Sequence, residues 1–185
     1  MKPKKQSTNK YVRYIVGFSF GKGSHNSPGP TNNGLAYSIY KILLSYKKHN
    51  KPFPKLLLQE ELAKSLLKQF KLPTDVIIKR KHTHRYLDTQ EVATQAAMHV
   101  KSKDNKVLVV AHPDHIARCI TELNSLGISA IKSTFFYRTN IPWHTYKCNA
   151  NGYSKKSTQP WTRTRKQFLT HEKTLNTLKH KSKLN

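Results

Sequence analysis

The segment with the clearest potential for chemistry runs Ala111-His-Pro-Asp-His-Ile-Ala-Arg118. Because proline suits the first turn of a helix, Pro113 predicts a helix that starts here, with His112 near its N-cap. The free N–H groups of such a helix start attract anions. His115 and Arg118 are three residues apart, so we expect them to face one ligand from one side of the helix. The alternative is a helical ion pair between Asp114 and Arg118, which leaves both histidines unexplained.

Acidic residues, of which the chain has only nine, gather after the predicted strands. Five of the nine fall in three short connections, namely Glu60, Glu61, Asp88, Glu91 and Asp114. Ligands bind outside the carboxyl ends of the strands of an open parallel sheet, where these connections are expected to lie. We interpret them as parts of one ligand site. Two local alternatives stay open: Asp88 as an N-cap with Glu91 three residues on, and residues 60–61 as the first turn of a helix.

The sequence leaves open whether the chain is an enzyme. If it is, His115 with Glu91 or Asp114 is the candidate set for acid and base catalysis, in hydrolysis or group transfer. Arg118 would hold a phosphate or carboxylate with its two-pronged guanidinium. No nucleophilic triad is recognisable, because Ser27 and Cys119 have no identifiable base beside them.

A glycine-rich stretch follows the first predicted strand. Five of the seven glycines lie between Gly17 and Gly34, in a segment that also contains Ser27-Pro28. The segment carries neither the G-x-G-x-x-G pattern in the right place nor a P-loop, which argues against ordinary dinucleotide or NTP binding. We expect its backbone, including Gly17, to approach an anionic ligand closely.

Hydrophobic periodicity predicts strands that alternate with helices. Strands are expected at residues 11–18, 55–59, 75–79, 106–111 and 129–135, and helices near residues 35–46, 62–70, 92–100, 116–123 and 162–179. The run VLVV in the fourth strand predicts burial on both faces. The alternation predicts an α/β fold: a doubly wound, Rossmann-like, mostly parallel five-stranded sheet with helices on both faces. Gly127 is expected at the C′ position of the fourth helix.

The sequence predicts one domain between two short basic ends. Residues 1–10 are expected to form a basic N-terminal arm, residues 11–179 a single domain, and residues 180–185 a basic C-terminal tail. Residues 135–161 hold seven of the aromatic side chains and predict a long covering loop before the last helix.

Composition sets limits on function. The chain has 185 residues with 34 Lys and Arg against 9 Asp and Glu, a formal net charge of +25. Such a charge favours polyanions, so a basic nucleic-acid-binding protein is one alternative, although no nucleic-acid-binding motif accompanies it. The two cysteines exclude a disulfide scaffold and a cysteine-rich zinc module. No apolar run is long enough for a membrane span and no secretory signal is recognisable, so we expect a cytoplasmic protein.

Several of these motifs together resemble the DUF218 family, also called YdcF-like or SanA/ElyC-like. The resemblance rests on the order and spacing of Gly17, Ser27-Pro28, Thr89-Gln-Glu91-Val92-Ala93, Ala111-His112, His115-Ile-Ala-Arg118 and Gly127, and it covers roughly residues 11–172. Residues 157–172 are similar to the closing helix of the family. The chain departs from the family in two places: Val92 replaces an asparagine, and Gln59-Glu-Glu61 replaces a Ser-Gly-Gly sequence.

The resemblance implies a small anionic or nucleotide-like ligand, such as the adenosyl compound S-adenosylmethionine, and a link to envelope biogenesis. It implies that the ligand contacts Gly17, Ser27, Gln59, Glu61, Thr89, His112 and Arg118. No metal ligands are expected in this site.

A second resemblance is more local. Ala111-His-Pro-Asp114 is similar to a motif of zinc N-deacetylases of the PIG-L type, in which an acid that follows this sequence binds the metal. Here His115 stands at that position and can also bind zinc. A zinc-dependent hydrolase is therefore the other alternative, although the motif of that family follows its first strand and here it follows the fourth.

Overall fold

The computed structural model describes residues 12–25, 27–80, 87–101, 106–132 and 141–181. Its strands are β1 (Tyr14–Gly17), β2 (Lys55–Gln59), β3 (Val76–Ile78), β4 (Val107–Val110) and β5 (Ala130–Lys132). Its α-helices are α1 (Pro30–Lys48), α2 (Glu60–Phe70), α3 (Thr89–Ala97), α4 (Ile116–Ser125) and α6 (Arg165–Lys181). Two short 3-10 helices, η1 (Trp143–Tyr146) and η2 (Pro160–Thr162), lie between β5 and α6.

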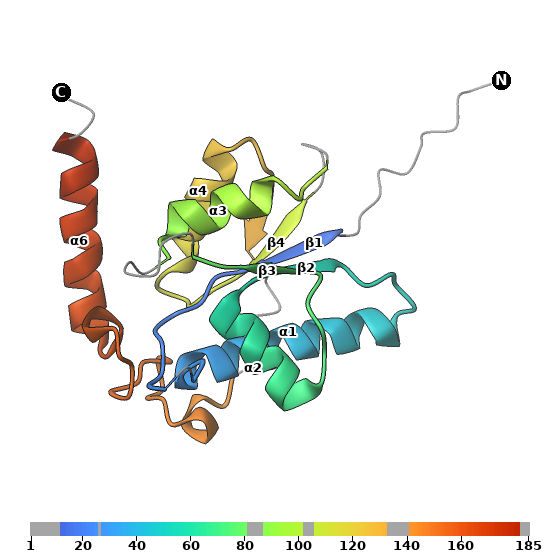
Figure 1. Cartoon of the computed structure of the whole chain (residues 1–185), viewed down its shortest axis with the longest axis horizontal. Coiled ribbons are helices and arrows are strands. Elements are labelled where there is room, and N and C mark those ends of the chain that lie inside the picture. Colours follow the sequence, from blue (N-terminus) through green and yellow to red (C-terminus); the bar gives the residue numbers. More distant parts are fainter. Residues whose placement is uncertain (1–11, 26, 81–86, 102–105, 133–140, 182–185) are drawn as a thin grey trace.

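The five strands form one parallel sheet in the order β3-β2-β1-β4-β5 (Figure 1). β1 lies at the centre, where Ile15 pairs with Leu56 on one side and Leu108 on the other. Every residue of β1 and β4 is buried, as expected of strands covered on both faces. The predicted α/β fold with a Rossmann-like sheet is confirmed.

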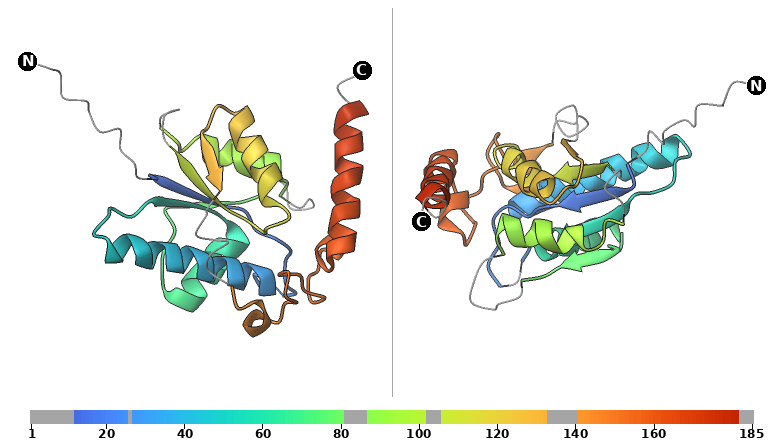
Figure 2. Two further views of the ribbon diagram at one scale, coloured as in Figure 1. Left: turned by 180° about the vertical axis from the view of Figure 1, so that it is seen from behind. Right: turned by 90° about the horizontal axis from the view of Figure 1, so that it is seen from above.

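Helices cover both faces of the sheet, as Figures 1 and 2 show. Alternate strand residues point to opposite faces. Ile15 therefore shares a buried core with side chains of α1 and α2, among them Ile39. Val16, the next residue, shares a second core with Val92 of α3 and Leu123 of α4. Each face of the sheet thus has its own apolar layer.

The predicted boundaries differ from the structure at several helix ends. α4 begins at Ile116 rather than at Pro113, because residues 113–115 form a turn in which the N–H groups of His115 and Ile116 both donate to the carbonyl of His112. α3 ends at Ala97, three residues before the predicted end. α6 begins at Arg165, since residues 160–162 form η2 instead.

α1 is longer than the hydrophobic pattern predicts. It begins at Pro30, five residues before the predicted start, because proline is suited to the first turn of a helix. The glycine-rich segment therefore ends inside a helix, in which Asn32 and Gly34 are buried.

Other predicted features are confirmed or fall outside the described residues. Gly127 follows the C-cap of α4 with φ +76° and donates its N–H to the carbonyl of Asn124, as expected of a C′ glycine. β5 covers residues 130–132 of the predicted strand, and residues 133–135 lie outside the described residues. The predicted N-terminal arm also lies outside them. The predicted C-terminal tail starts inside α6, which continues to Lys181.

Residues 141–164, which precede α6, contact the start of α1, where the hydroxyl of Thr31 donates to the carbonyl of Gly152. η1 packs on α1, where a Cβ at Gly34 would lie 2.5 Å from the ring of Trp143. α6 stands beyond the carboxyl ends of the strands, at the left in Figure 1. Within the described ranges, no helix is both long and apolar enough to cross a membrane.

Candidate functional site

A cleft of about 290 Å³ lies at the carboxyl ends of the strands. Its walls come from the segments that follow β1, β2, β3 and β4 and from η2 and α6. The lining residues are Phe18, Ser19, Phe20, Gly21, Gln59, Glu61, Arg80, Leu87, Asp88, Thr89, Gln90, His115, Arg118, Glu122, Gln159, Trp161, Thr162, Phe168, His171 and Leu175. The strand order reverses between β1 and β4, and segments after both strands line the cleft. This is the place where open α/β sheets bind ligands.

The cleft brings together half of the residues that the sequence indicates as a site. Gln59, Glu61, Thr89, His115 and Arg118 all line it. The side-chain oxygen of Gln59 accepts a hydrogen bond from the N–H of Ser19 at 2.9 Å, which joins the ends of β1 and β2. The sequence predicts that the connections after several strands converge, and these five residues do so.

Gly17 and Ser27 do not line the cleft. A Cβ at Gly17 would lie 2.6 Å from side-chain atoms of both Leu58 and Leu62, so this glycine permits close packing of β1 against its neighbours. Ser27 is exposed, and its hydroxyl accepts a hydrogen bond from the N–H of Gly29 at 3.4 Å. Both residues have local structural roles, and their positions give no support to the expected contact with a ligand in this cleft.

His112 is buried away from the cleft. Its Nε2 lies 2.8 Å from the carbonyl oxygen of Asn151, and its Nδ1 accepts a hydrogen bond from the N–H of Asp114 at 3.2 Å. Its ring stacks on Phe20 with centroids 3.9 Å apart. Burial lowers the pKa of His112 to about 4, so the ring is neutral near pH 7. Both ring nitrogens of His112 have partners within the protein, so its position gives no support to the expected contact with a ligand in this cleft.

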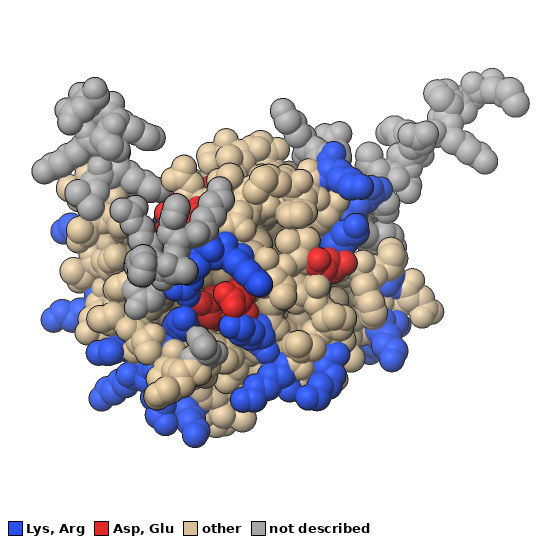
Figure 3. Space-filling view, viewed as in Figure 1, with Lys and Arg blue, Asp and Glu red and all other residues tan. Residues whose placement is uncertain are grey.

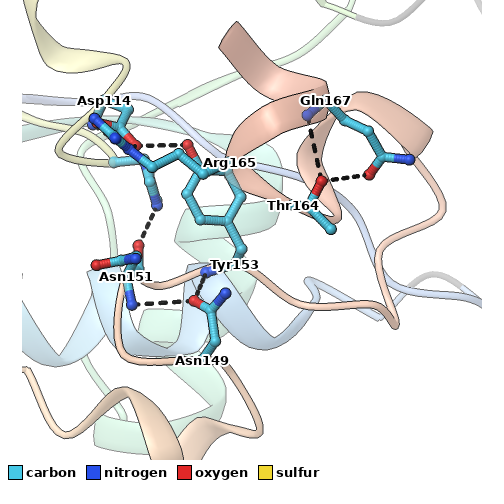
Figure 4. A network of polar contacts seen from close by, with 8 residues as sticks. Asp114, Asn149, Asn151, Tyr153, Thr164, Arg165 and Gln167 are labelled. Atoms are coloured by element: carbon cyan, nitrogen blue, oxygen red, sulfur yellow. Dashed lines mark hydrogen bonds and ion pairs between the residues drawn. The ribbon is translucent and has the colours of Figure 1, made fainter.

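Asp114 does not line the cleft and lies beside Arg165 at the start of α6 (Figure 4). Its carboxylate accepts two hydrogen bonds from Arg165, at 3.0 and 3.2 Å, and one from the hydroxyl of Tyr153 at 2.7 Å. Partial burial raises the pKa of Asp114, but the hydrogen bonds from Arg165 and Tyr153 outweigh it and hold the pKa below its usual value. The alternative of a helical ion pair between Asp114 and Arg118 is therefore wrong.

Arg118 instead joins α4 to α6. Its Nη1 lies 2.9 Å from the carboxylate of Glu172. Its Nε is buried and has no hydrogen-bond partner within the described residues. The Nη1 of Arg118 therefore has a partner within the protein, whereas its Nε–H can still donate a hydrogen bond.

His115 lies between α3 and Arg118. Its Nε2 is 3.4 Å from the hydroxyl of Thr89, and its Nδ1 has no hydrogen-bond partner in the part of the chain that the structure describes. Burial first, and then the charge of Arg118, hold the pKa of His115 well below its usual value. A neutral imidazole can accept a proton from a ligand, but it cannot act as a charged acid near pH 7.

Glu91 takes no part in the cleft lining. The N–H of Glu91 donates to the carboxylate of Asp88 at 2.7 Å, which confirms Asp88 as the N-cap of α3. The side chain of Glu91 accepts a hydrogen bond from Gln95 at 3.3 Å. Of the three candidate acid and base residues, the cleft therefore includes His115 alone.

Sequence reasoning missed the residue that fixes the glycine-rich loop. Asn32 is fully buried, and its side chain accepts from the N–H of Phe20 and donates to the carbonyls of Gly21 and Pro28, at 2.6 to 2.9 Å. It also missed the contribution of α6, whose Phe168 lines the cleft. The sequence does contain a signal for that helix, because Glu172 is the only acid after residue 122, in a strongly basic stretch.

Comparisons with family models, with curated proteins and with solved structures found no match. Within the described residues, no three side chains of His, Cys, Asp or Glu are grouped so that they could hold a metal ion. His112 and Asp114, which the zinc alternative needs, both use their polar atoms within the protein.

Proposed function

We propose that the cleft binds a small anionic or nucleotide-like ligand, as the resemblance to the DUF218 family implies. The observation that carries this proposal is the pair of His115 and Arg118, two polar side chains that line the cleft with a buried Nδ1 and a buried Nε unpaired within the described residues. Buried polar groups normally have hydrogen-bond partners, and a ligand would supply them here.

The cleft also offers a surface for a flat ring. Phe18, Trp161 and Phe168 are among its lining residues, and Trp161 stacks on His171 with ring centroids 4.8 Å apart. Ligand sites combine such aromatic walls with a few convergent polar groups, and a volume of about 290 Å³ suits a small molecule. An adenosyl compound such as S-adenosylmethionine belongs to this class of ligand.

A screen for ligand-induced stabilisation tests the proposal. Nucleotides and adenosyl compounds are added in turn to the protein, and the melting temperature Tm is measured, because a ligand that binds only the folded state raises it. Arg118→Ala should abolish the rise, and Arg118→Lys should restore part of it, since an ammonium cannot reproduce a two-pronged contact. The matched control is Arg13→Ala, which removes the same charge from an exposed position outside the cleft. A ligand that stabilises wild type and Arg118→Ala equally would show that Arg118 does not contact it.

Nucleic-acid binding is a second candidate, favoured by the net charge of +25. Figure 3 shows Lys and Arg spread over much of one face, with Asp and Glu in few places. Binding of random oligonucleotides at rising salt tests this candidate, because phosphate contacts make affinity fall steeply with salt.

A cytoplasmic location stays part of the proposal, and the link to envelope biogenesis rests on the family resemblance.

A further inference from the structure

Three neighbouring elements on one face of the sheet form a surface that is nearly free of acids. α2 and η1 both pack on α1, and we call their outer side the α1–α2–η1 surface. α1 and η1 contain no Asp or Glu, and α2 contains none after Glu61. Residues 133–140, which precede η1 in the chain and lie outside the described residues, contain no acid either. The sequence around this surface therefore offers little to neutralise its lysines.

A row of half-buried aromatic rings crosses the α1–α2–η1 surface. Phe70 of α2 stacks on Tyr40 of α1, with ring centroids 4.4 Å apart and an interplanar angle of 7°. Phe70 also lies 6.4 Å from Tyr37 of α1, and the ring of Tyr37 lies 6.3 Å from that of Tyr146 in η1. All four rings keep part of their area exposed. Such rings suit the bases of a nucleic acid, because every base has a flat face that can stack on an aromatic side chain.

Positive charges alternate with the rings of this aromatic row. A lysine directly follows three of the four rings, in the pairs Tyr40-Lys41, Phe70-Lys71 and Tyr146-Lys147. Within the described part of the chain, none of these three lysines forms an ion pair with an acid. The end of a helix favours a lysine by itself, so the ring beside each lysine is the more specific sign. Rings and free cations in alternation are typical of surfaces that bind single strands.

The basic area continues from η1 toward α6. Lys155, Lys156 and Lys166 are all exposed in this part of the chain. Figure 3 shows Lys and Arg gathered along the lower edge of the molecule, where η1, α2 and the residues before α6 lie in Figure 1. An extended row of cations fits a polymer that carries a phosphate at every residue.

We infer that the α1–α2–η1 surface binds single-stranded nucleic acid, with phosphates at the lysines of the three pairs and bases against the aromatic row. The inference rests on nucleic-acid binding, the second candidate above, and gives that candidate a surface and a preferred form of nucleic acid. A single strand fits better than a duplex, because the bases of a duplex are already stacked on one another. None of the seven residues lines the cleft, so the two sites are separate.

The first measurement compares a single strand with a duplex on the intact protein. A fluorescein-labelled strand of about 12 nucleotides and mixed sequence is titrated with protein, alone and annealed to its complement. Fluorescence anisotropy gives the dissociation constant Kd of each at the same salt concentration. The single strand should bind roughly tenfold tighter than the duplex, since only its bases can reach the rings.

A set of aromatic variants tests the stacking. Tyr37→Leu removes a ring without changing the charge, so it should weaken binding of the single strand roughly five- to tenfold and leave binding of the duplex unchanged. Tyr37→Phe keeps the ring and should bind the single strand as wild type does. The matched control is Phe53→Leu, because Phe53 is 61% exposed but lies between α1 and β2, outside the aromatic row.

A lysine variant tests the phosphate contacts. Lys147→Gln should lower the slope of log affinity against log salt concentration by about 0.7, the value expected for one phosphate of a single strand. Lys101→Gln is the control, since Lys101 is equally exposed but follows α3, which packs on the opposite face of the sheet.

The outcomes separate the inference from the candidates on which it builds. Equal binding of single strand and duplex, or wild-type binding by Tyr37→Leu, would overturn the inference and leave nucleic-acid binding by charge standing. Failure of both oligonucleotides to bind would contradict nucleic-acid binding altogether and leave the ligand cleft untouched. Binding to vesicles of phosphatidylserine and phosphatidylcholine that displaces the single strand and is insensitive to Tyr37→Leu would assign the surface to membranes and overturn the inference.

Discussion

His112 makes the stability of the fold depend on pH in a way that can be calculated. Its pKa falls from 6.5 to about 4 on folding, because burial disfavours the charged ring. The unfolded chain therefore binds more protons than the folded protein between these two values. The stabilisation is fully present above about pH 6.5 and is lost progressively as the pH falls toward 4. At about 1.4 kcal/mol per pKa unit, His112 should account for a loss of about 2.5 kcal/mol between pH 7 and about pH 4.5.

The variant that isolates this effect is His112→Gln. Glutamine does not titrate, but it loses the acceptor for the N–H of Asp114 and the stacking on Phe20, so the free energy of unfolding at pH 7 should fall by about 2–3 kcal/mol. Urea unfolding at pH 7 and at about pH 4.5 gives the free energy of unfolding of each protein. The difference between the two pH values should be about 2.5 kcal/mol smaller in the variant than in wild type. The variant should still lose some free energy of unfolding as the pH falls, because the pKa of His115 is also lowered in the folded protein.

The control is His99→Gln, which removes an exposed imidazole and should behave as wild type does. If His112→Gln loses the same free energy as wild type between the two pH values, His112 does not stay neutral in the folded protein. Its role as a buried neutral hydrogen-bonding ring would then be refuted.

Three further substitutions test packing and hydrogen bonds within the fold, each by urea unfolding at pH 7. Tyr153→Phe removes the hydrogen bond to the carboxylate of Asp114 and should cost about 1.5–3 kcal/mol; no change would mean that water replaces the hydroxyl fully. Asn32→Ala leaves three buried backbone groups without the amide that binds them and should cost about 3 kcal/mol or more, with a weaker response to any cleft ligand; a loss below about 1 kcal/mol would contradict its role in the loop. Gly17→Ala forces a Cβ against Leu58 and should cost about 1–3 kcal/mol; an unchanged stability would show that the strand core can yield.

The sheet and its helices could be predicted from the sequence because their signals are local. The residues of β4 are apolar on both faces, and a run of that kind suits a covered strand. Asp88 could likewise be identified as a cap from its spacing to Glu91. Helix starts are harder to predict: Pro113 suits the first turn of a helix, but the carbonyl of His112 instead closes a turn that precedes α4.

The site could be predicted only in part because it depends on partners far apart in the sequence. Spacing favours a pair of Asp114 with Arg118, but Asp114 pairs with Arg165 and Arg118 with Glu172, both on α6. Residue type alone also cannot separate His112 from His115, since both follow the same strand. In the fold His112 is enclosed between Phe20 and the carbonyl of Asn151, whereas His115 lines the cleft.

The position of α6 in the chain has a consequence for the order of folding during synthesis. All five strands are complete by residue 132, whereas one wall of the cleft comes from residues 159–175. Because the ribosome delivers the chain from its N-terminus, the sheet can assemble before that wall exists. A nascent chain that ends before α6 would then have its central sheet but no complete cleft. Tyr153 and Phe168 would then join the core of a sheet whose strands are already paired.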